Sequence, residues 1–288
     1  MPKLAEIVHP DIILITNVGP SHLEFLDTVE DVARCKLELV RQAKSSVPLI
    51  INGDDALLVQ ETKKVRKNFT TFAMDRKADF MVDEVHLYDN GTSSVTIDGH
   101  PFKLPLVGRH QIYNLLAAYA IFKTLDYDFA GIDTGVISLD TAPMRGQRVT
   151  KNGIMFVADC YNANPESMRA GLEAYFAAET SGRRVLVLGD MLELGATSEQ
   201  YHRQVGAQLA KYGFDKAVMV GGQSAYARDE AVKLGVSANL FEPHETAAGA
   251  ARSMKGFLQA GDFVYIKGSR GVGLEAVLNV FDEAEEPS

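Results

Sequence analysis

The second half of the chain alternates short apolar runs with amphipathic segments, and this alternation restricts the fold more than any other feature. Each of four apolar runs is followed by a segment with helical character; the runs are Arg184–Gly189, Ala217–Val220, Asn239–Phe241 and Phe263–Ile266. Strands that alternate with helices are typical of a parallel sheet covered by helices, with right-handed crossovers. We therefore expect an α/β domain in this half.

The first half of the chain is mixed. Residues 11–16 and 48–52 have the composition of strands, and Thr28 opens a helix with Asp31 in the capping-box position. Residues 79–107 indicate antiparallel strands instead, because hairpin-type turn signals interrupt them. The two signals are Asp89-Asn90-Gly91 and Asp98-Gly99. Pro143 and Gly146 interrupt the pattern again, so we expect one domain over residues 1–143 and a second over residues 144–288.

Composition excludes several classes of protein. The net charge is −9, with 38 acidic against 29 basic residues and no basic block, which argues against a nucleic-acid partner. The two cysteines, Cys35 and Cys160, fit a reducing compartment and not a disulfide framework. The longest apolar stretches, such as Ile12–Ile15, are too short to cross a bilayer, and the first residues do not resemble a signal peptide. The sequence predicts a cytoplasmic protein without membrane insertion.

A cluster of polar side chains follows the apolar run at residues 154–158. The cluster contains Asp159, Tyr161, Asn162 and Asn164. Asn164 has a simple explanation, since it can cap the helix that Pro165 begins. The other three lie at the carboxyl end of a predicted strand, where open α/β sheets bind ligands. We expect them to line a binding site.

Lys36 occupies an unusual place on the helix that Thr28 opens. The apolar stripe of this helix consists of Val29, Val32, Ala33, Leu37 and Val40, and Lys36 falls on the same stripe. An unpaired buried ammonium costs several kcal/mol, so this lysine must reach the surface, find a partner or be chemically changed. Upstream, His22 lies just past the strand at residues 11–16. Its position is compatible with a metal ligand and with a solvated histidine.

Five segments between residues 15 and 273 resemble, in order, the motifs of the Mur ligase family of peptidoglycan synthesis. The segments read "ITNVGPSHLE…ARCKLE", "GRHQIYNLLAAYA", "DCYNANPESM", "GDMLELG" and "KGSRG". The third and fourth are most similar to the branch that joins D-alanyl-D-alanine to UDP-N-acetylmuramoyl-tripeptide. The resemblance implies an α/β fold in which residues 1–143 are the C-terminal part of a central ATP-binding domain, a mixed sheet with helices. Residues 144–288 would be a Rossmann-like ligase domain.

The resemblance also implies a chemistry. Members of the family use ATP and Mg²⁺ to convert a carboxylate to an acyl phosphate, which an incoming amine then attacks. His22 would be a magnesium ligand, and Lys36 a carbamylated lysine whose added carboxylate helps to bind the metal. Asn114 would reach the nucleotide, although Gln111 stands where the family usually has asparagine.

In the second half, the resemblance assigns the polar cluster to the nucleotide and the cleft. Asp159 would bind the ATP ribose, Tyr161 would lie against the nucleotide, and Asn162 and Asn164 would line the cleft. Arg145 or Arg148 would lie near the phosphates, and the sequence leaves open which. The residues expected to face D-alanyl-D-alanine are Lys267, Ser269 and Arg270, although this glycine-rich string is also compatible with a plain anion-binding turn. Asp190 and Glu193 of "GDMLELG" are explained equally well as turn formers.

One expected motif is missing from the 288 residues. They contain no Gly-x-x-x-x-Gly-Lys-Ser/Thr segment of the kind that binds phosphates. In the family this loop and the UDP-binding domain precede the segments found here, so we expect the chain to be the C-terminal part of a ligase, inactive alone and monomeric at full length. Two alternatives remain: a related ligase of the folylpolyglutamate synthase type, against which the "DCYNANP" turn argues, and a non-catalytic two-domain binding module.

Overall fold

The computed structural model describes residues 7–88, 93–104, 108–127, 142–279 and 281. The expected turn at Asp89-Asn90-Gly91 lies outside these residues. The chain divides into two compact units between Leu139 and Asp140, and each unit is described by itself. Among the described residues, no helix combines the length and the apolar character needed to cross a bilayer.

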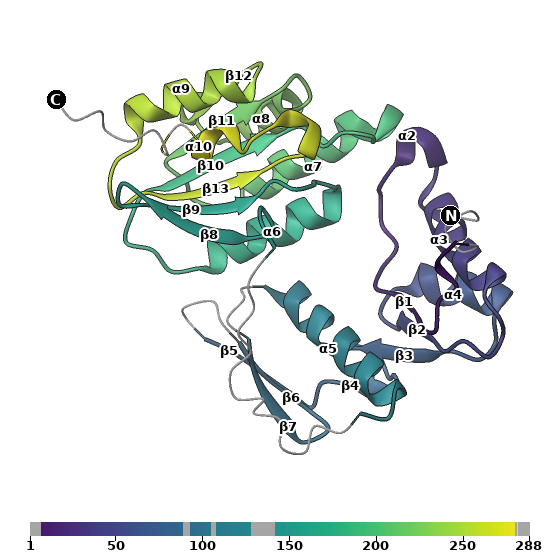
Figure 1. Ribbon diagram of the computed structural model, residues 1–288. Coiled ribbons are helices and arrows are strands. Elements are labelled where there is room, and N and C mark those ends of the chain that lie inside the picture. Colours follow the sequence, from purple (N-terminus) through teal and green to yellow (C-terminus); the bar gives the residue numbers. More distant parts are fainter. Residues whose placement is uncertain (1–6, 89–92, 105–107, 128–141, 280, 282–288) are drawn as a thin grey trace. The chain divides into compact units, whose positions relative to one another are not determined.

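The first unit contains a four-stranded parallel sheet with the strands in chain order (Figure 1). The strands are β1 (Ile13–Ile15), β2 (Leu49–Asn52), β3 (Thr70–Ala73) and β4 (Phe80–Met81). After β1 come the short helix α2 (Leu23–Leu26) and then α3 (Val29–Gln42), whereas α4 (Ala56–Val65) connects β2 to β3. The expected cap of α3 is confirmed, since the amide of Asp31 donates to the Thr28 hydroxyl over 3.1 Å. The apolar stripe of α3 packs on the strands, with Leu37 fully buried.

An antiparallel sheet and one long helix complete the first unit. The sheet consists of β5 (Glu84–Leu87), β6 (Ser93–Ile97) and β7 (His100–Leu104), and the helix is α5 (Arg109–Thr124). The expected Asp98-Gly99 turn is confirmed, with both residues at positive φ. Tyr119 of α5 is buried between Phe80 and Phe102, which ties the helix to both sheets.

The second unit is built on a six-stranded sheet in the order β12-β11-β10-β13-β9-β8. Its strands are β8 (Gln147–Lys151), β9 (Ile154–Asp159), β10 (Arg184–Gly189), β11 (Lys216–Val220), β12 (Phe241–His244) and β13 (Phe263–Lys267). Only β8 runs antiparallel to its neighbour among these strands. The expected α/β architecture is therefore confirmed. Because β13 inserts between β9 and β10, the carboxyl ends of these three strands lie together.

Helices cover both faces of this sheet (Figure 1). They are α6 (Pro165–Ala177), α7 (Ser198–Leu209), α8 (Ser224–Lys233), α9 (Ala247–Phe257) and α10 (Ala276–Asn279). Apolar residues of α9 and α10 share one core with β9, β10, β11 and β13. On the other face Tyr175 of α6 stacks on Phe263 and Tyr265, with ring centroids 4.7 and 5.2 Å apart. Residues 265 and 267 of β13 therefore point toward the α6 side.

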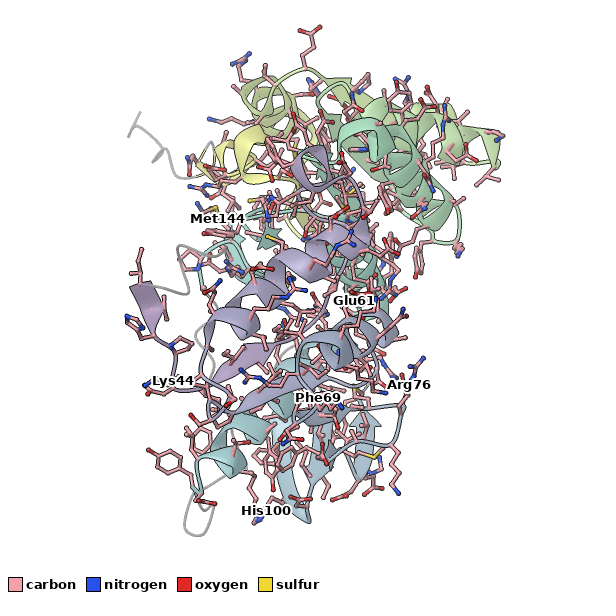
Figure 2. The ribbon with its side chains drawn as sticks, turned by 90° about the vertical axis from the view of Figure 1, so that its right-hand side faces the viewer. Lys44, Glu61, Phe69, Arg76, His100 and Met144 are labelled. Atoms are coloured by element: carbon pink, nitrogen blue, oxygen red, sulfur yellow. The ribbon has the colours of Figure 1, made fainter. Side chains whose placement is uncertain are left out.

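Arg66 fastens the end of α3 to the start of β2. Its guanidinium donates to the carbonyl oxygens of Val40, Ala43, Lys44 and Val47 at 3.1, 3.3, 3.2 and 2.8 Å. Figure 2 shows Lys44 in this turn, at the opposite end of the parallel sheet from Arg76. The carbonyls at a helix end have no partner within the helix, so one cation satisfies several of them.

We predict that Arg66→Ala destabilises the first unit by roughly 1.5–3 kcal/mol, because hydrogen bonds from a charged donor are lost at partly buried carbonyls. Urea unfolding followed by circular dichroism measures the change. Arg34→Ala is the matched control, since Arg34 is exposed and pairs with Asp31 one turn away on the same helix. Equal stabilities for the two variants would contradict the role given to Arg66.

Candidate functional site

In the first unit, Lys36 and Asp55 hold a single peptide group from its two sides. The Lys36 ammonium donates to the carbonyl oxygen of Asn17 over 2.8 Å, and the amide of Val18 donates to Oδ2 of Asp55 over 2.6 Å. The other oxygen of Asp55 accepts from the amide of Leu58 and so caps α4. The loop between β1 and α2, which contains His22, is thereby anchored to α3 and to the turn after β2.

The surroundings of Lys36 favour its neutral form more than water does. Burial lowers the pKa of this amine, while the charges of Asp55 and Cys35 partly oppose the shift. Only a neutral amine can react with CO₂, so the half-buried position makes Lys36 a chemically reasonable carbamylation site. His22 lies at the start of α2 with a left-handed backbone, φ 55°.

Lys36 can take part in a magnesium site only if it is modified. The described residues do not bring three or more His, Cys, Asp or Glu side chains together as a metal site. Mg²⁺ prefers oxygen ligands, and an ammonium repels it. A carbamate on Lys36 would replace that cation with a carboxylate close to Asp55. The residues therefore fit magnesium in the modified state and not in the unmodified one.

Asp54 organises the other side of the turn after β2. Its carboxylate accepts hydrogen bonds from the amides of Met74, Asp75 and Arg76 at 2.7, 3.1 and 2.8 Å, and from the Tyr113 hydroxyl at 2.8 Å. Burial raises the pKa of Asp54, but these hydrogen bonds outweigh burial and hold the pKa below its usual value. The loop after β3 and the start of α5 are both attached to this one side chain.

Asn114 follows Tyr113 on α5 and is exposed. Its side-chain amide donates to Oε1 of Gln111 over 3.1 Å. Asn114 is therefore bonded to the residue that stands where the family usually has asparagine. Sequence reasoning missed Asp54, Asp55 and Tyr113. The adjacent acids directly after an apolar strand were the available signal, because carboxyl ends of neighbouring parallel strands share one edge.

In the second unit, the turn after β9 is bound to the end of β13. Oδ2 of Asp159 accepts hydrogen bonds from the ammonium of Lys267 over 2.7 Å and from the hydroxyl of Tyr265 over 2.9 Å. Ser269 donates to the carbonyl of Ala163 over 3.3 Å and accepts from the amide of Leu192 over 2.9 Å. The ends of β9, β10 and β13 are thus joined, and Lys267 and Ser269 are buried in the junction.

The two asparagines of the turn act on the backbone in this structure. Asn164 caps α6 in a capping box with Ser167, as its sequence context predicts. Oδ1 of Asn162 accepts from the amide of Ala163 over 2.9 Å. Both contacts explain why asparagine suits these positions.

Exposed groups gather beside this turn. Arg145 lies over the ring of Tyr161, with its guanidinium carbon 4.0 Å from the ring centroid, and 45% of Tyr161 is exposed. Arg270 is half exposed and contacts the sulfur of Met144, next to Arg145. Arg148 is also exposed, within β8. A flat aromatic ring with two nearby guanidinium groups can bind an anion that carries a planar base.

Comparison with known proteins identifies the family of this chain. The profile of the Mur ligase middle domain matches residues 2–122, and that of the Mur ligase, glutamate ligase domain matches residues 144–270. The chain belongs to the Mur ligase family.

Relatives named UDP-N-acetylmuramoyl-tripeptide–D-alanyl-D-alanine ligase match almost the whole chain. The Bacillus subtilis protein is 30% identical over 99% of this chain and 61% of its own length. The Escherichia coli protein is 30% identical over 96% of this chain and 61% of its own length. Similar solved structures include the Thermotoga maritima MurF ligase in complex with ADP (TM-score 0.80, 25% identity, 98% of this chain, 64% of that one). The structure of MurF from Acinetobacter baumannii has a TM-score of 0.82 and 25% identity; the match covers 98% of this chain and 62% of that one. The chain spans about three-fifths of these relatives' length.

The fourth motif of this Mur ligase chain has a structural role. Oδ1 of Asp190 accepts from the amide of Ser224 at the start of α8, over 2.7 Å. Nε2 of His202 accepts from the amide of Met191 over 3.0 Å, while its Nδ1–H donates to the carbonyl of Ser198 over 2.8 Å. This pattern requires a neutral imidazole. Burial lowers the pKa of His202, partly opposed by the Ser198 carbonyl and the charge of Asp190.

We predict that His202 makes the second unit less stable in acid. The unfolded chain protonates this histidine near its usual pKa of 6.5, whereas the folded unit does so only at lower pH. Stability is therefore complete above about pH 6.5 and falls below it, by at most about 1.4 kcal/mol per pH unit for one proton. Thermal unfolding between pH 7.5 and 5 measures the slope. His202→Gln should flatten it, whereas the exposed control His86→Gln should not; an unchanged slope in His202→Gln would rule the effect out.

Proposed function

We propose that residues 1–288 form part of an ATP-dependent ligase that joins D-alanyl-D-alanine to UDP-N-acetylmuramoyl-tripeptide in peptidoglycan synthesis. The observation that carries the proposal is the joined edge of the second sheet, where Asp159, Tyr161 and Arg145 lie around one turn. Similarity to enzymes of that name over nearly the whole chain supports it. We infer a cytoplasmic setting, in keeping with two free cysteines.

In the proposed reaction, the tripeptide carboxylate attacks the γ-phosphorus of ATP, and ADP leaves. The amine of D-alanyl-D-alanine then attacks the acyl phosphate, and the tetrahedral intermediate collapses to the amide with release of phosphate. Such phosphoryl transfers depend mostly on positioning and charge neutralisation. Asp159 would bind the ribose, Tyr161 would lie against the nucleotide, and Arg145 would bind phosphate oxygens. We prefer Arg145 to Arg148 for this role because the Arg145 guanidinium lies over the Tyr161 ring.

The first unit would contribute the metal-binding groups. Magnesium, when bound, would neutralise phosphate charge, with His22 and a carbamate on Lys36 as ligands. Carbamylation needs only CO₂: the lone pair of neutral Nζ bonds to carbon, one C=O electron pair moves to oxygen, and a proton passes to water. Asn114 would contact the nucleotide from the exposed face of α5.

We predict that Lys36 forms this carbamate without any other substrate. The 288-residue chain in ¹³C-bicarbonate should give a carbamate carbon signal in NMR that grows as the pH rises, because more of the amine is neutral. Lys36→Ala should abolish the signal, and the exposed control Lys44→Ala should retain it. A signal that survives Lys36→Ala would assign the carbamate to another amine.

We also predict that ligation needs residues beyond these 288. The chain has no glycine-rich lysine loop for the β- and γ-phosphates, and loss of one such electrostatic group commonly costs a factor of roughly 10²–10³. A chimera that adds the uncovered part of the Bacillus subtilis relative should release phosphate only with both substrates, at least about 10²-fold faster than the chain alone.

The same assay separates the alternatives. Phosphate release that depends on glutamate and a folate in place of the two peptidoglycan precursors would indicate a ligase of the folylpolyglutamate synthase type. ATP binding without turnover in the folded chimera would indicate a binding module. Fast turnover by the 288 residues alone would mean that the phosphate site is built from other residues.

A further inference from the structure

Alternate residues of β13 and the loop after it contact the Asp159–Ala163 turn one after another. Tyr265 and Lys267 bind the Asp159 carboxylate, and Ser269 binds the Ala163 carbonyl. Asp159 and Lys267 stand opposite each other in the parallel ladder between β9 and β13. Side chains two apart share one face of a strand, so this spacing directs Tyr265 and Lys267 toward the turn, and Ser269 follows in the loop after β13.

The ammonium of Lys267 has no hydrogen left for a ligand. A lysine ammonium has three donors. It lies 2.7 Å from Oδ2 of Asp159 and 3.4 Å from the carbonyl oxygens of Asp159 and Asn162. Only 1% of Lys267 is exposed. The expected contact of Lys267 with a substrate carboxylate is therefore replaced by contacts within the protein, and Arg270 is the exposed cation of this motif.

The Asp159 carboxylate is held unequally. Oδ2 accepts both the Lys267 ammonium and the Tyr265 hydroxyl. Within the described part of the chain, no donor is bound to Oδ1, and a quarter of the Asp159 side chain is exposed. One oxygen is thus fixed to the protein while the other remains available to accept hydrogen bonds from outside.

Gly171 makes room for this arrangement. A Cβ at this position of α6 would lie 1.9 Å from the Tyr265 hydroxyl and 3.3 Å from Oδ2 of Asp159. Tyr265 is buried and stacked on Tyr175, so its ring has little freedom to move away. Glycine costs a helix interior roughly 0.5–1 kcal/mol relative to alanine, and here it lets the hydroxyl reach the carboxylate.

We propose that Lys267 and Tyr265 are positioning residues for Asp159, holding Oδ2 so that Oδ1 is presented to the hydroxyl groups of a nucleotide ribose. The ribose as ligand rests on the proposed function. A buried ion pair is a poor source of stability, because the desolvation of both charges offsets their attraction. Here the ion pair fixes the orientation of the Asp159 carboxylate, because a carboxylate with one oxygen anchored cannot rotate away from its ligand.

The test compares ATP with 2′,3′-dideoxy-ATP, which lacks both ribose hydroxyls. NMR titration of the 288-residue chain measures both dissociation constants. The wild-type chain should prefer ATP by roughly ten-fold or more, as expected for charge-assisted hydrogen bonds. Lys267→Met should remove most of this preference, Tyr265→Phe should reduce it, and Asp159→Asn should mimic Lys267→Met. The surface control Lys211→Met should keep the full preference.

The preference between the two nucleotides, and not affinity alone, decides the outcome. Circular dichroism identifies any variant that fails to fold, and Tyr265→Phe and Gly171→Ala then decide in place of Lys267→Met. A folded set of variants that all keep the wild-type preference would overturn the positioning role while leaving the ribose contact intact. A wild-type chain that binds both nucleotides equally, or neither, would overturn the ribose assignment itself.

Discussion

The edge of the second unit depends on one buried ammonium. Lys267 has no access to water, so its charge must be compensated by oxygen atoms of the protein, and these come from the turn after β9. Removing one partner of a buried ion pair commonly costs 3–5 kcal/mol, much more than the pair itself contributes. The turn is consequently held by a strand more than a hundred residues later as well as by its own asparagines.

In the first unit, carboxylates instead of an ammonium hold the loops at the edge of the sheet. Asp54 and Asp55 follow the central strand β2 and accept amides from the loops on either side. Anions that receive several backbone N–H groups are well stabilised without a cation. The two units thus use opposite charges for the same purpose, since each charge is matched to what the neighbouring loops offer: N–H groups around Asp54 and Asp55, carbonyl oxygens around Lys267.

Local patterns predicted much of this molecule, and contacts between distant segments account for what they missed. The α/β alternation, the Thr28 and Asn164 caps and the Asp98-Gly99 turn each depend on a few adjacent residues. The position of β13 between β9 and β10 does not, and without it Lys267 was expected to face D-alanyl-D-alanine. The adjacent acids of the β2 turn were a visible signal, but their partners were not, because the amides they bind belong to segments up to 37 residues away.

The geometry around Lys267 also explains why an arginine could not replace it. A guanidinium carries five donors in a plane, whereas this enclosed site offers three acceptors arranged around one nitrogen. Two donors would be buried without partners, at a cost of roughly 1–3 kcal/mol each, and the longer side chain would press on the Asp159 turn. Three residues later the requirement reverses. Arg270 is half exposed and lies 3.7 Å from Glu275, so water can satisfy the donors that the protein does not. The two cations of one short motif therefore meet different constraints: Lys267 must match a closed set of protein acceptors, whereas Arg270 stays partly open to solvent.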